Sequence, residues 1–321
     1  MNSVTEVSGG EDLRASRTFA WLVRWGLYPS LWLWTLVCIG YAISHPDSMQ
    51  EVQMIKGGVM IVVLLFCEWI LPYRRRWGMT WRYLLKRDLV FIVFNGATIA
   101  LLSTALVMVA VVVSEYTEGP MSGKPLFLQV VVGLIVFEAL QYGVHRIMHM
   151  SRGPITNVLW RAHSIHHLPQ QLYVVMHAVF HPINAIVVRL FVQLLPLWAL
   201  GFDPLAVLAY GSVIALHGTI SHFNVDLRMG WLNYLFVGPE LHRYHHSAKS
   251  HEAHNYGAAL SLFDLLFNTF LYRPGVPPQV LGLKRENGYP EQVAPLTALL
   301  FPLSVSAVSA DMVEQSGDVA A

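Results

Sequence analysis

The residues of this sequence that are best suited to chemistry are histidines, which recur at helical spacings. The motifs are H-x-x-x-H at His145 and His149, H-x-x-H-H at His163, His166 and His167, and H-x-x-H-H again at His242, His245 and His246. Residues three or four positions apart lie on one face of a helix. With 15 histidines in 321 residues, chance gives roughly 0.03 copies of H-x-x-H-H when template matches are counted. Two copies therefore indicate a function.

The chemistry that these side chains suggest is metal binding. Neutral imidazole binds iron, copper, nickel and zinc, and one ion takes about four to six donors. The two cysteines, Cys38 and Cys67, lie in apolar segments, far from the histidine motifs in the sequence. Thiolate-rich zinc sites and copper electron-transfer sites are therefore disfavoured. A pair of iron ions with open positions for dioxygen fits best, and the candidate ligands are His145, His149, His163, His166, His167, His222, His242, His245 and His246.

The remaining polar residues of these segments are open to more than one interpretation. A lone histidine at the end of a span is usually structural, which is our interpretation of His45 and His177. The choice between ligand and structural residue stays open for His181, His217, His251 and His254. Glu138, Gln141 and Glu68 could orient imidazole N–H groups from behind. Glu68 could instead reach the membrane surface.

The composition is that of a membrane protein. The chain is 55% hydrophobic and 13% charged, whereas soluble domains have roughly 25% charged residues. Its 21 Lys and Arg against 20 Asp and Glu leave a formal charge of +1. This balance gives no reason to expect nucleic acid as a partner.

Long apolar segments predict a multi-pass helical bundle. Polar residues 1–18 are interpreted as a disordered leader and not as a cleaved signal peptide, because the apolar run behind them is too long for one. Predicted spans cover residues 19–43, 57–71, 89–114 and 126–144, followed by an apolar hairpin of residues 183–202 and 204–220 that either crosses or dips into the membrane. The run 296–308 is too short to cross, so it is expected to pack or to lie at the interface, ahead of a disordered tail.

The distribution of cations predicts the orientation of the bundle. Arg74, Arg75, Arg76, Arg82, Lys86 and Arg87 occupy one short loop, whereas the loops 44–56 and 115–125 have one lysine each. The positive-inside rule places the cationic loop in the cytoplasm. By the parity of the spans, all the clustered histidines reach that side. We therefore expect an all-α transmembrane bundle with a cytoplasmic histidine-rich cap.

Within the cap, prolines and glycines punctuate the helices. Gly153 and Pro154 break the chain after the first motif, Asn157 is a candidate helix cap, and Pro169 ends the next helix. Pro239 predicts the start of the helix that holds the last motif. The expected regions are the leader 1–18, N-terminal spans 19–125, a catalytic region 126–291 and a tail 292–321.

The motifs resemble the histidine boxes of the fatty-acid hydroxylase/sterol desaturase superfamily, which are membrane-bound, non-haem di-iron oxygenases. The resemblance covers roughly residues 126–272, including His181-Pro182, the His222 region and Asn255-Tyr256-Gly257 with Asp264. Asn184 stands where the family commonly has Glu. The spacing between His217 and His222 is also wider than the spacing often seen in the family. The first box resembles those of sterol desaturases and alkylglycerol monooxygenases.

The resemblance implies that the box residues and His222 hold two iron ions. It further implies an attack on an unactivated C–H bond of a lipid that uses O2 and electrons and gives an alcohol or an alkene. No fused haem domain is present in this sequence, so a separate reductase, ferredoxin or cytochrome is expected to donate electrons. The expected location is the inner membrane of a bacterium or the endoplasmic reticulum of a eukaryote.

The predicted function is therefore a lipid hydroxylase or desaturase whose substrate is a sterol, fatty acyl, alkylglycerol or amino-acid lipid. The rival interpretation is a histidine-rich membrane metal transporter or sensor. A transporter needs ligands near the midplane of the membrane. The histidines here gather at helix ends, which disfavours transport.

Overall fold

A computed structural model of the protein describes residues 16–114, 119–283 and 288–304, and within these ranges it is all helical without a strand. Isolated bridges pair Phe236 with Leu260 and Ser247 with Leu281. The prediction of an all-α fold is confirmed. The longer helices are α1 (Arg17–Ser44), α2 (Met49–Ile70), α4 (Leu89–Ser114), α5 (Leu126–Met148), α6 (Pro154–His167) and α9 (Pro204–Ser221).

Shorter helical segments complete the fold. They are α3 (Trp81–Tyr83), α7 (Pro182–Val187), α8 (Leu195–Leu200), α10 (Pro239–His245), α11 (Leu262–Leu266) and α12 (Pro295–Leu300). Two π-helical segments are η3 (Leu84–Asp88) and η5 (Val188–Leu194), and η5 joins α7 to α8 without a break. The 3-10 turns are η1 (Pro46–Ser48), η2 (Arg75–Trp77), η4 (Val174–Ala178), η6 (Gly230–Tyr234), η7 (Ser250–Glu252) and η9 (Phe301–Leu303).

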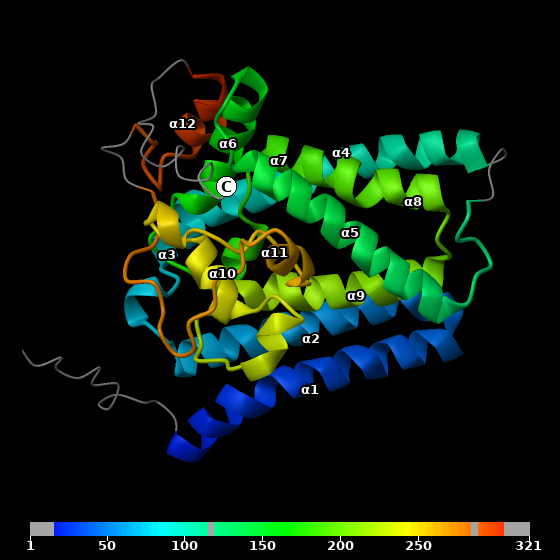
Figure 1. Ribbon diagram of the computed structural model, residues 1–321, viewed down its shortest axis with the longest axis horizontal. Coiled ribbons are helices and arrows are strands. Elements are labelled where there is room, and N and C mark those ends of the chain that lie inside the picture. Colours follow the sequence, from blue (N-terminus) through cyan, green and yellow to red (C-terminus); the bar gives the residue numbers. More distant parts are fainter. Residues whose placement is uncertain (1–15, 115–118, 284–287, 305–321) are drawn as a thin grey trace, which may run out of the picture.

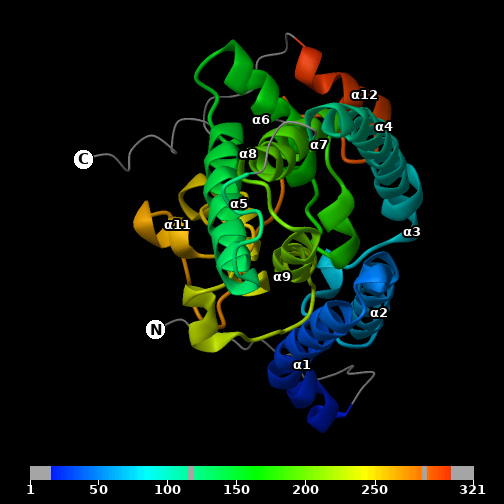
Figure 2. The same ribbon diagram turned by 90° about the vertical axis from the view of Figure 1, so that its right-hand side faces the viewer.

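Helices α1, α2, α4, α5 and α9 and the continuous α7–α8 segment extend along the bundle, whereas α3, α6, α10, α11 and α12 gather towards one end as a cap (Figure 1). Among the described residues, five segments are long and apolar enough to cross a membrane: Arg17–Ser44, Pro46–Ile70, Leu126–Met148, Pro182–Leu200 and Pro204–Ser221. Both arms of the predicted hairpin are among these five. In an end-on view α4, α5, α8 and α9 surround a common centre, while α1 and α2 lie to one side (Figure 2).

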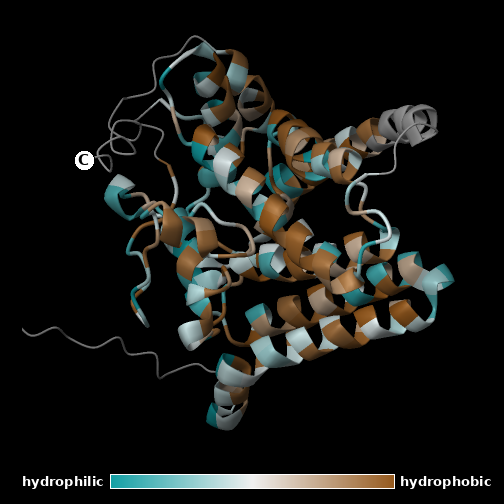
Figure 3. Ribbon diagram, turned by 45° about the vertical axis from the view of Figure 1, so that its right-hand side comes forward, coloured by the Kyte–Doolittle hydropathy of each residue, from teal (hydrophilic) through white to brown (hydrophobic). Residues whose placement is uncertain are grey.

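The outer surface of the bundle is apolar, as contact with lipid requires. Hydrophobic residues predominate on the long helices, whereas hydrophilic residues are more frequent in the cap and the connections (Figure 3). Large apolar side chains such as Trp21, Leu33, Val62, Phe127 and Trp198 are exposed on these helices. Apolar surface of this extent is rare on a soluble monomer. The protein is therefore a membrane protein.

The first predicted loop, residues 44–56, is largely wrong. Only residues 45–48 connect α1 to α2, because α2 begins at Met49, eight residues before the predicted span. Two polar side chains in this stretch pack against protein, since Gln53 is partly buried and Lys56 is buried, whereas Gln50 and Glu51 are exposed. The Gln53 amide donates to the Leu208 carbonyl over 3.2 Å and to the Ser212 hydroxyl over 3.1 Å. Hydropathy alone does not detect such pairing.

The cap lies at the end of the bundle that holds the cationic loop. The connection between α2 and α4 contains the six arginines and lysines of the cationic loop. It includes α3, which lies at the cap end of the bundle (Figure 1). Arg87 is buried there, where its guanidinium donates to Asp88 over 2.7 Å and to the Tyr173 hydroxyl over 2.6 Å. The histidines and the cationic loop are therefore on the same side of the bundle, as the parity of the spans predicts.

The ends of the chain differ slightly from their predictions. Ser16 caps α1, which begins at Arg17, two residues inside the predicted leader; residues 1–15 lie outside the described ranges. Near the other end, Ala298 and Phe301 pack with Trp160 of α6. The apolar run from 296 is therefore packed against the cap, and residues 305–321, with the predicted tail, lie outside the described ranges.

Candidate metal centre

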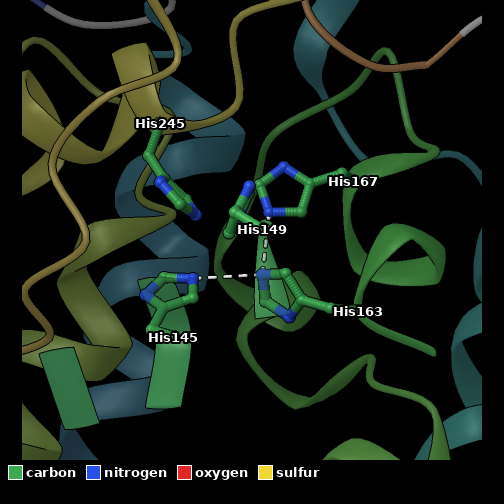
Figure 4. A group of neighbouring side chains, drawn as sticks. All are labelled: His145, His149, His163, His167 and His245. Carbon is green, nitrogen blue, oxygen red and sulfur yellow. Dashed lines mark hydrogen bonds between the residues drawn. The ribbon is translucent and has the colours of Figure 1, made fainter. Parts of the chain in front are cut away.

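All nine predicted ligands come together in two neighbouring groups. The first group is His145, His149, His163, His167 and His245, and the second is His166, His222, His242 and His246. One nitrogen from each member lies within 4.8 Å of the corresponding nitrogens of its group. Figure 4 shows the five imidazoles of the first group converging from α5, α6 and α10. Histidines far apart in the sequence therefore form one compact centre.

Helix geometry explains how each H-x-x-H-H box serves both groups. His163 and His167 are four residues apart on α6 and lie in the first group, whereas His166 turns to the second. On α10 the arrangement is reversed, since His242 and His246 lie in the second group and His245 lies in the first. Residues at i and i+4 share a helix face, but adjacent residues are about 100° apart. The H-x-x-H-H pattern is therefore suited to two adjoining sites.

The spacing of the ring nitrogens suits coordination. In the first group, the Nε2 of His163 lies 3.0 Å from the Nε2 of His145 and 3.0 Å from that of His167. In the second group, the Nε2 of His222 lies 3.0 Å from that of His166 and 3.1 Å from that of His242. Two donors at right angles on one ion lie about 3.0 Å apart when each metal–nitrogen bond is about 2.1 Å.

Hydrogen bonds behind the rings fix their orientation. The Nδ1–H of His145 donates to the Tyr256 carbonyl over 2.7 Å, and that of His166 donates to the Val179 carbonyl over 3.0 Å. The Nδ1–H of His163 donates to the Asn184 side-chain oxygen over 2.8 Å. When Nδ1 carries the proton, the lone pair is on Nε2, which faces the group.

Two further rings are held in the same way. The Nδ1–H of His222 donates to the Ser221 hydroxyl over 2.9 Å, while this hydroxyl donates to the Gly218 carbonyl over 2.7 Å. The Nδ1–H of His245 donates to the His254 carbonyl over 3.1 Å. Most of these acceptors are backbone carbonyls, which no side-chain motif reveals. The groups that orient the rings therefore cannot be predicted from the sequence.

Glu138 positions the loop behind His145 and not the imidazole itself. Its carboxylate accepts backbone N–H bonds from Ala258 over 2.7 Å, Ala259 over 2.9 Å and Leu260 over 3.0 Å. Asp264 accepts from the N–H groups of Tyr256 and Gly257, each over 2.8 Å. The two carboxylates therefore hold the loop whose Tyr256 carbonyl orients His145.

Glu68 has a comparable role on the other side of the centre. Its carboxylate accepts from the backbone N–H of Val174 over 2.9 Å and of Asn224 over 2.8 Å. It fastens the segment that follows His222 to α2, so these bonds hold backbone and not an imidazole. Asn157 lies inside α6, which begins at Pro154 with Gly153 as its N-cap, so the prediction that Asn157 caps this helix is wrong.

Burial keeps the imidazoles neutral and available to a metal. Desolvation lowers the pKa of His166 from 6.5 to about 3, and neighbouring histidines reinforce this shift. Burial likewise lowers the pKa well below 6.5 for His163, His167, His242, His245 and His246. Among the described residues, the buried Nε2 atoms of His149 and His245 have no hydrogen-bond partner. Converging neutral lone pairs require a cation, so both groups fit metal ions.

The other histidines lie outside the two groups. His181 accepts from the Ile183 N–H at the start of α7, and its Nε2–H donates to the Leu299 carbonyl over 3.0 Å. His217 donates to the Val237 carbonyl over 2.8 Å and stacks on Phe236. His251 is exposed, and His254 contributes its carbonyl to the His245 ring. His45 stacks on Tyr41, and the ring of His177 lies 5.8 Å from that of His222.

A large cavity leads from the centre into the bundle. Its volume is about 730 Å³, and it is lined by α4, α5, the α7–α8 segment and α9. His145, His163, His166, His222 and His242 line the end at the cap, while Phe202 and Val207 line the end at the opposite loop. Most of the other lining side chains are apolar. A cavity of this size and polarity suits the chain of a lipid.

An apolar helical bundle with buried histidine groups at the head of a lipid-sized cavity defines a membrane enzyme that acts on lipids. The chain belongs to the fatty acid hydroxylase family, whose model matches residues 130–269. It is also 30% identical over 288 residues to a protein of Rhizobium tropici called ornithine lipid hydroxylase OlsE, covering 82% of each chain. No solved structure matches the chain significantly. The protein is accordingly a lipid hydroxylase.

Proposed function

We propose that the protein is a di-iron oxygenase that hydroxylates an amino-acid-containing lipid of the ornithine lipid type. The observation that carries this proposal is the two-group arrangement of nine histidines at the head of the 730 Å³ cavity. The relative's substrate, as its name gives it, is an ornithine lipid. The family and the relative are both named for hydroxylation, which favours an alcohol over an alkene as the product.

The ligand assignment follows the two groups. His145, His149, His163, His167 and His245 would hold one ion, and His166, His222, His242 and His246 would hold the other. Neutral nitrogen donors suit iron, and the second group leaves positions open on an ion that accepts six donors. When bound, the iron pair supplies the activation of dioxygen for attack on a C–H bond.

The surrounding residues orient the imidazoles and exclude water from the cavity. The Nδ1 hydrogen bonds of His145, His163 and His166 keep the Nε2 lone pairs aimed inward. The apolar wall of the cavity excludes water from the substrate chain and presents one segment of the lipid to the histidines. These tasks require rigid support, which the loop fastened by Glu138 and Asp264 supplies.

We assign the cap to the cytoplasm, because the cationic loop lies at the same end. A separate reductase, ferredoxin or cytochrome would then deliver electrons from the cytoplasmic side. A small pocket of about 50 Å³, lined partly by polar side chains, supports this direction of approach. Arg146, Ser250 and His254 line it together with His149 and His245 of the first group.

Reconstitution tests the proposal. The purified protein in lipid nanodiscs is loaded with iron and given ornithine lipid, O2 and a reductase–ferredoxin pair, and the products are analysed by mass spectrometry. We expect about two iron ions per chain and a product heavier by about 16 mass units, the mass of one oxygen atom. Protein that binds no iron, or that forms no O2-dependent product with any of several amino-acid lipids, would contradict the proposal.

Metal transport is the rival function, and its test is independent. Both histidine groups come from the cap helices α6 and α10 and from the ends of α5 and α9 that reach the cap (Figure 1), whereas transporters bind their cargo near the midplane of the membrane. Proteoliposomes that contain the protein should therefore not accumulate Fe²⁺ or Zn²⁺ faster than empty liposomes. Faster accumulation would favour transport.

A further inference from the structure

Arg189 lines the lipid cavity from within a candidate membrane-spanning segment. Among the described residues of the cavity wall, it alone carries a full charge at neutral pH, since its neighbours are apolar, small or neutral polar. A charged side chain at membrane depth is costly, and such residues usually face a bundle interior and mark a functional pathway. A purely hydrocarbon occupant would gain nothing from this guanidinium.

The π-helical segment η5 places Arg189 in the cavity wall. The residues of this segment that line the cavity come in adjacent pairs, and each pair follows the previous one by four positions. The pairs are Asn184 and Ala185, Val188 and Arg189, Val192 and Gln193, and Pro196 and Leu197. In a regular α-helix a four-residue repeat drifts by about 40° per step. The wider turn of η5, residues 188–194, offsets this drift. One continuous face therefore lines the cavity from Asn184 to Leu197.

Gln193 fixes the orientation of the guanidinium. The Arg189 Nη1 donates to the Gln193 Oε1 over 2.6 Å. The side-chain oxygen of Gln193 is thereby occupied, and its amide nitrogen remains a donor. Together, the two side chains present N–H groups and a positive charge to the cavity, which is the donor set that binds a carboxylate or a phosphate.

We propose that Arg189 and Gln193 bind an oxyanion of the lipid substrate inside the cavity. This inference rests on the proposed function and names the chemical class of its substrate as a lipid with a carboxylate or phosphate group. Asn184, which contacts His163, lies five residues before Arg189, or about 7 Å along the helix axis. The carbon presented to the histidines is therefore only a few bonds from the bound oxyanion.

Binding to metal-free protein tests the proposal without turnover. Native mass spectrometry of the protein in detergent gives dissociation constants for four probes. These are an N-acyl ornithine lipid with a free carboxylate, its methyl ester, phosphatidylglycerol and diacylglycerol. We expect Arg189→Gln to weaken the binding of the preferred oxyanion lipid roughly 10- to 100-fold, and to leave the methyl ester and diacylglycerol unchanged. The lipid whose dissociation constant rises in Arg189→Gln identifies the oxyanion as a carboxylate or a phosphate.

Two variants sharpen the result. Arg189→Lys keeps the charge but loses the planar fork, so it should retain part of the preference for oxyanion lipids. Arg17→Gln removes an exposed arginine at the start of α1 and should change no dissociation constant. The melting temperature of each variant verifies that it is folded. The proposal is overturned if wild-type protein binds the methyl ester as tightly as the free acid and phosphatidylglycerol no better than diacylglycerol, or if Arg189→Gln weakens all four lipids equally.

The two proposals fail in different ways. Wild-type protein that prefers oxyanion lipids but never hydroxylates them would contradict the proposed function while supporting the binding site. Protein that hydroxylates ornithine lipid with the same KM in wild type and Arg189→Gln would contradict the binding site alone. If the site is present, tandem mass spectrometry should also locate the added oxygen within a few bonds of the oxyanion.

Discussion

His166 and His167 are adjacent in the chain, yet their imidazoles belong to different histidine groups. Their ring centroids lie 5.5 Å apart and their planes are nearly perpendicular, at 88°. His245 and His246 repeat this relationship with an angle of 89°. Each pair of neighbours joins the two groups through a single peptide bond. The separation between the two sites is therefore set by backbone geometry on α6 and α10.

Removing one ligand from each group should affect different ions. We expect His167→Ala to weaken metal binding in the five-histidine group and His166→Ala to weaken it in the four-histidine group. Each variant should retain about one iron ion per chain and lose hydroxylation, because the chemistry requires both ions. Metal analysis with Mössbauer spectroscopy distinguishes the remaining site in each variant.

His217→Ala provides the comparison, because His217 is a buried histidine outside both groups. This variant should keep its full iron content, although it loses a hydrogen bond to Val237. The ligand assignment is wrong if His163→Ala and His245→Ala retain both full iron content and full activity.

Asn184 should control metal affinity through His163. Asn184→Leu removes the acceptor of the His163 Nδ1–H, so the ring loses its preferred orientation. Loss of such a partner typically costs about 10- to 100-fold in metal affinity. Asn184→Asp supplies another acceptor and should restore most of the affinity. Competition with a chelator measures both variants, and equal affinity in wild type and Asn184→Leu would show that this hydrogen bond is dispensable.

The nine clustered histidines could be predicted from the sequence because the signal is local. Helical spacing places His163 with His167 and His242 with His246, and the parity of the spans brings the motifs to one end of the bundle. The division into groups of five and four requires the rotation of α6 against α10. That rotation depends on side-chain packing between segments that are distant in sequence, which periodicity does not encode.

The supporting contacts could not be predicted for a different reason. The carbonyls of Tyr256 and Val179 accept from His145 and His166, and any residue type offers a backbone carbonyl. Glu138 was expected to orient an imidazole, but its carboxylate instead binds the backbone of the loop at residues 258–260, which the sequence does not reveal. Arg189 is a charged residue within an apolar segment of the sequence, but its place in the cavity wall depends on the π-helical turn.

Gly257 should be intolerant of a side chain. A Cβ at this position would lie 2.6 Å from the Leu260 carbonyl oxygen and 2.9 Å from an Asp264 carboxylate oxygen. Gly257→Ala must therefore displace the loop that orients His145, at a cost of about 1–3 kcal/mol. We expect a lower melting temperature and lower iron occupancy. Gly58→Ala on α2 meets nothing within 4 Å and should not lower stability, so equal melting temperatures for the two variants would refute this explanation.

Metal-free protein should lose stability as the pH falls. The folded-state pKa of His166 is about 3 because burial disfavours its charged form, whereas the ordinary value is 6.5. Below pH 6.5 the unfolded chain therefore binds protons that the folded chain excludes. His166 alone should remove about 1.4 kcal/mol per pH unit down to its folded pKa. Melting temperatures should fall as the pH is lowered through this range, and His166→Gln should reduce the slope. His45→Gln removes an exposed histidine and should leave this slope unchanged. A melting temperature that does not depend on pH would contradict the prediction.

Filling the cavity at Gly211 should impair lipid turnover without disturbing the metal centre. Gly211 of α9 lines the cavity, and a Cβ there would meet nothing within 4 Å. Gly211→Ala should therefore keep wild-type kinetics. Gly211→Leu extends further into the space for the substrate, and overpacking of about 1–3 kcal/mol corresponds to a rise in KM of roughly 5- to 160-fold. Iron content should stay at the wild-type level in both variants. Equal KM values for the alanine and leucine variants would show that the lipid does not occupy this part of the cavity.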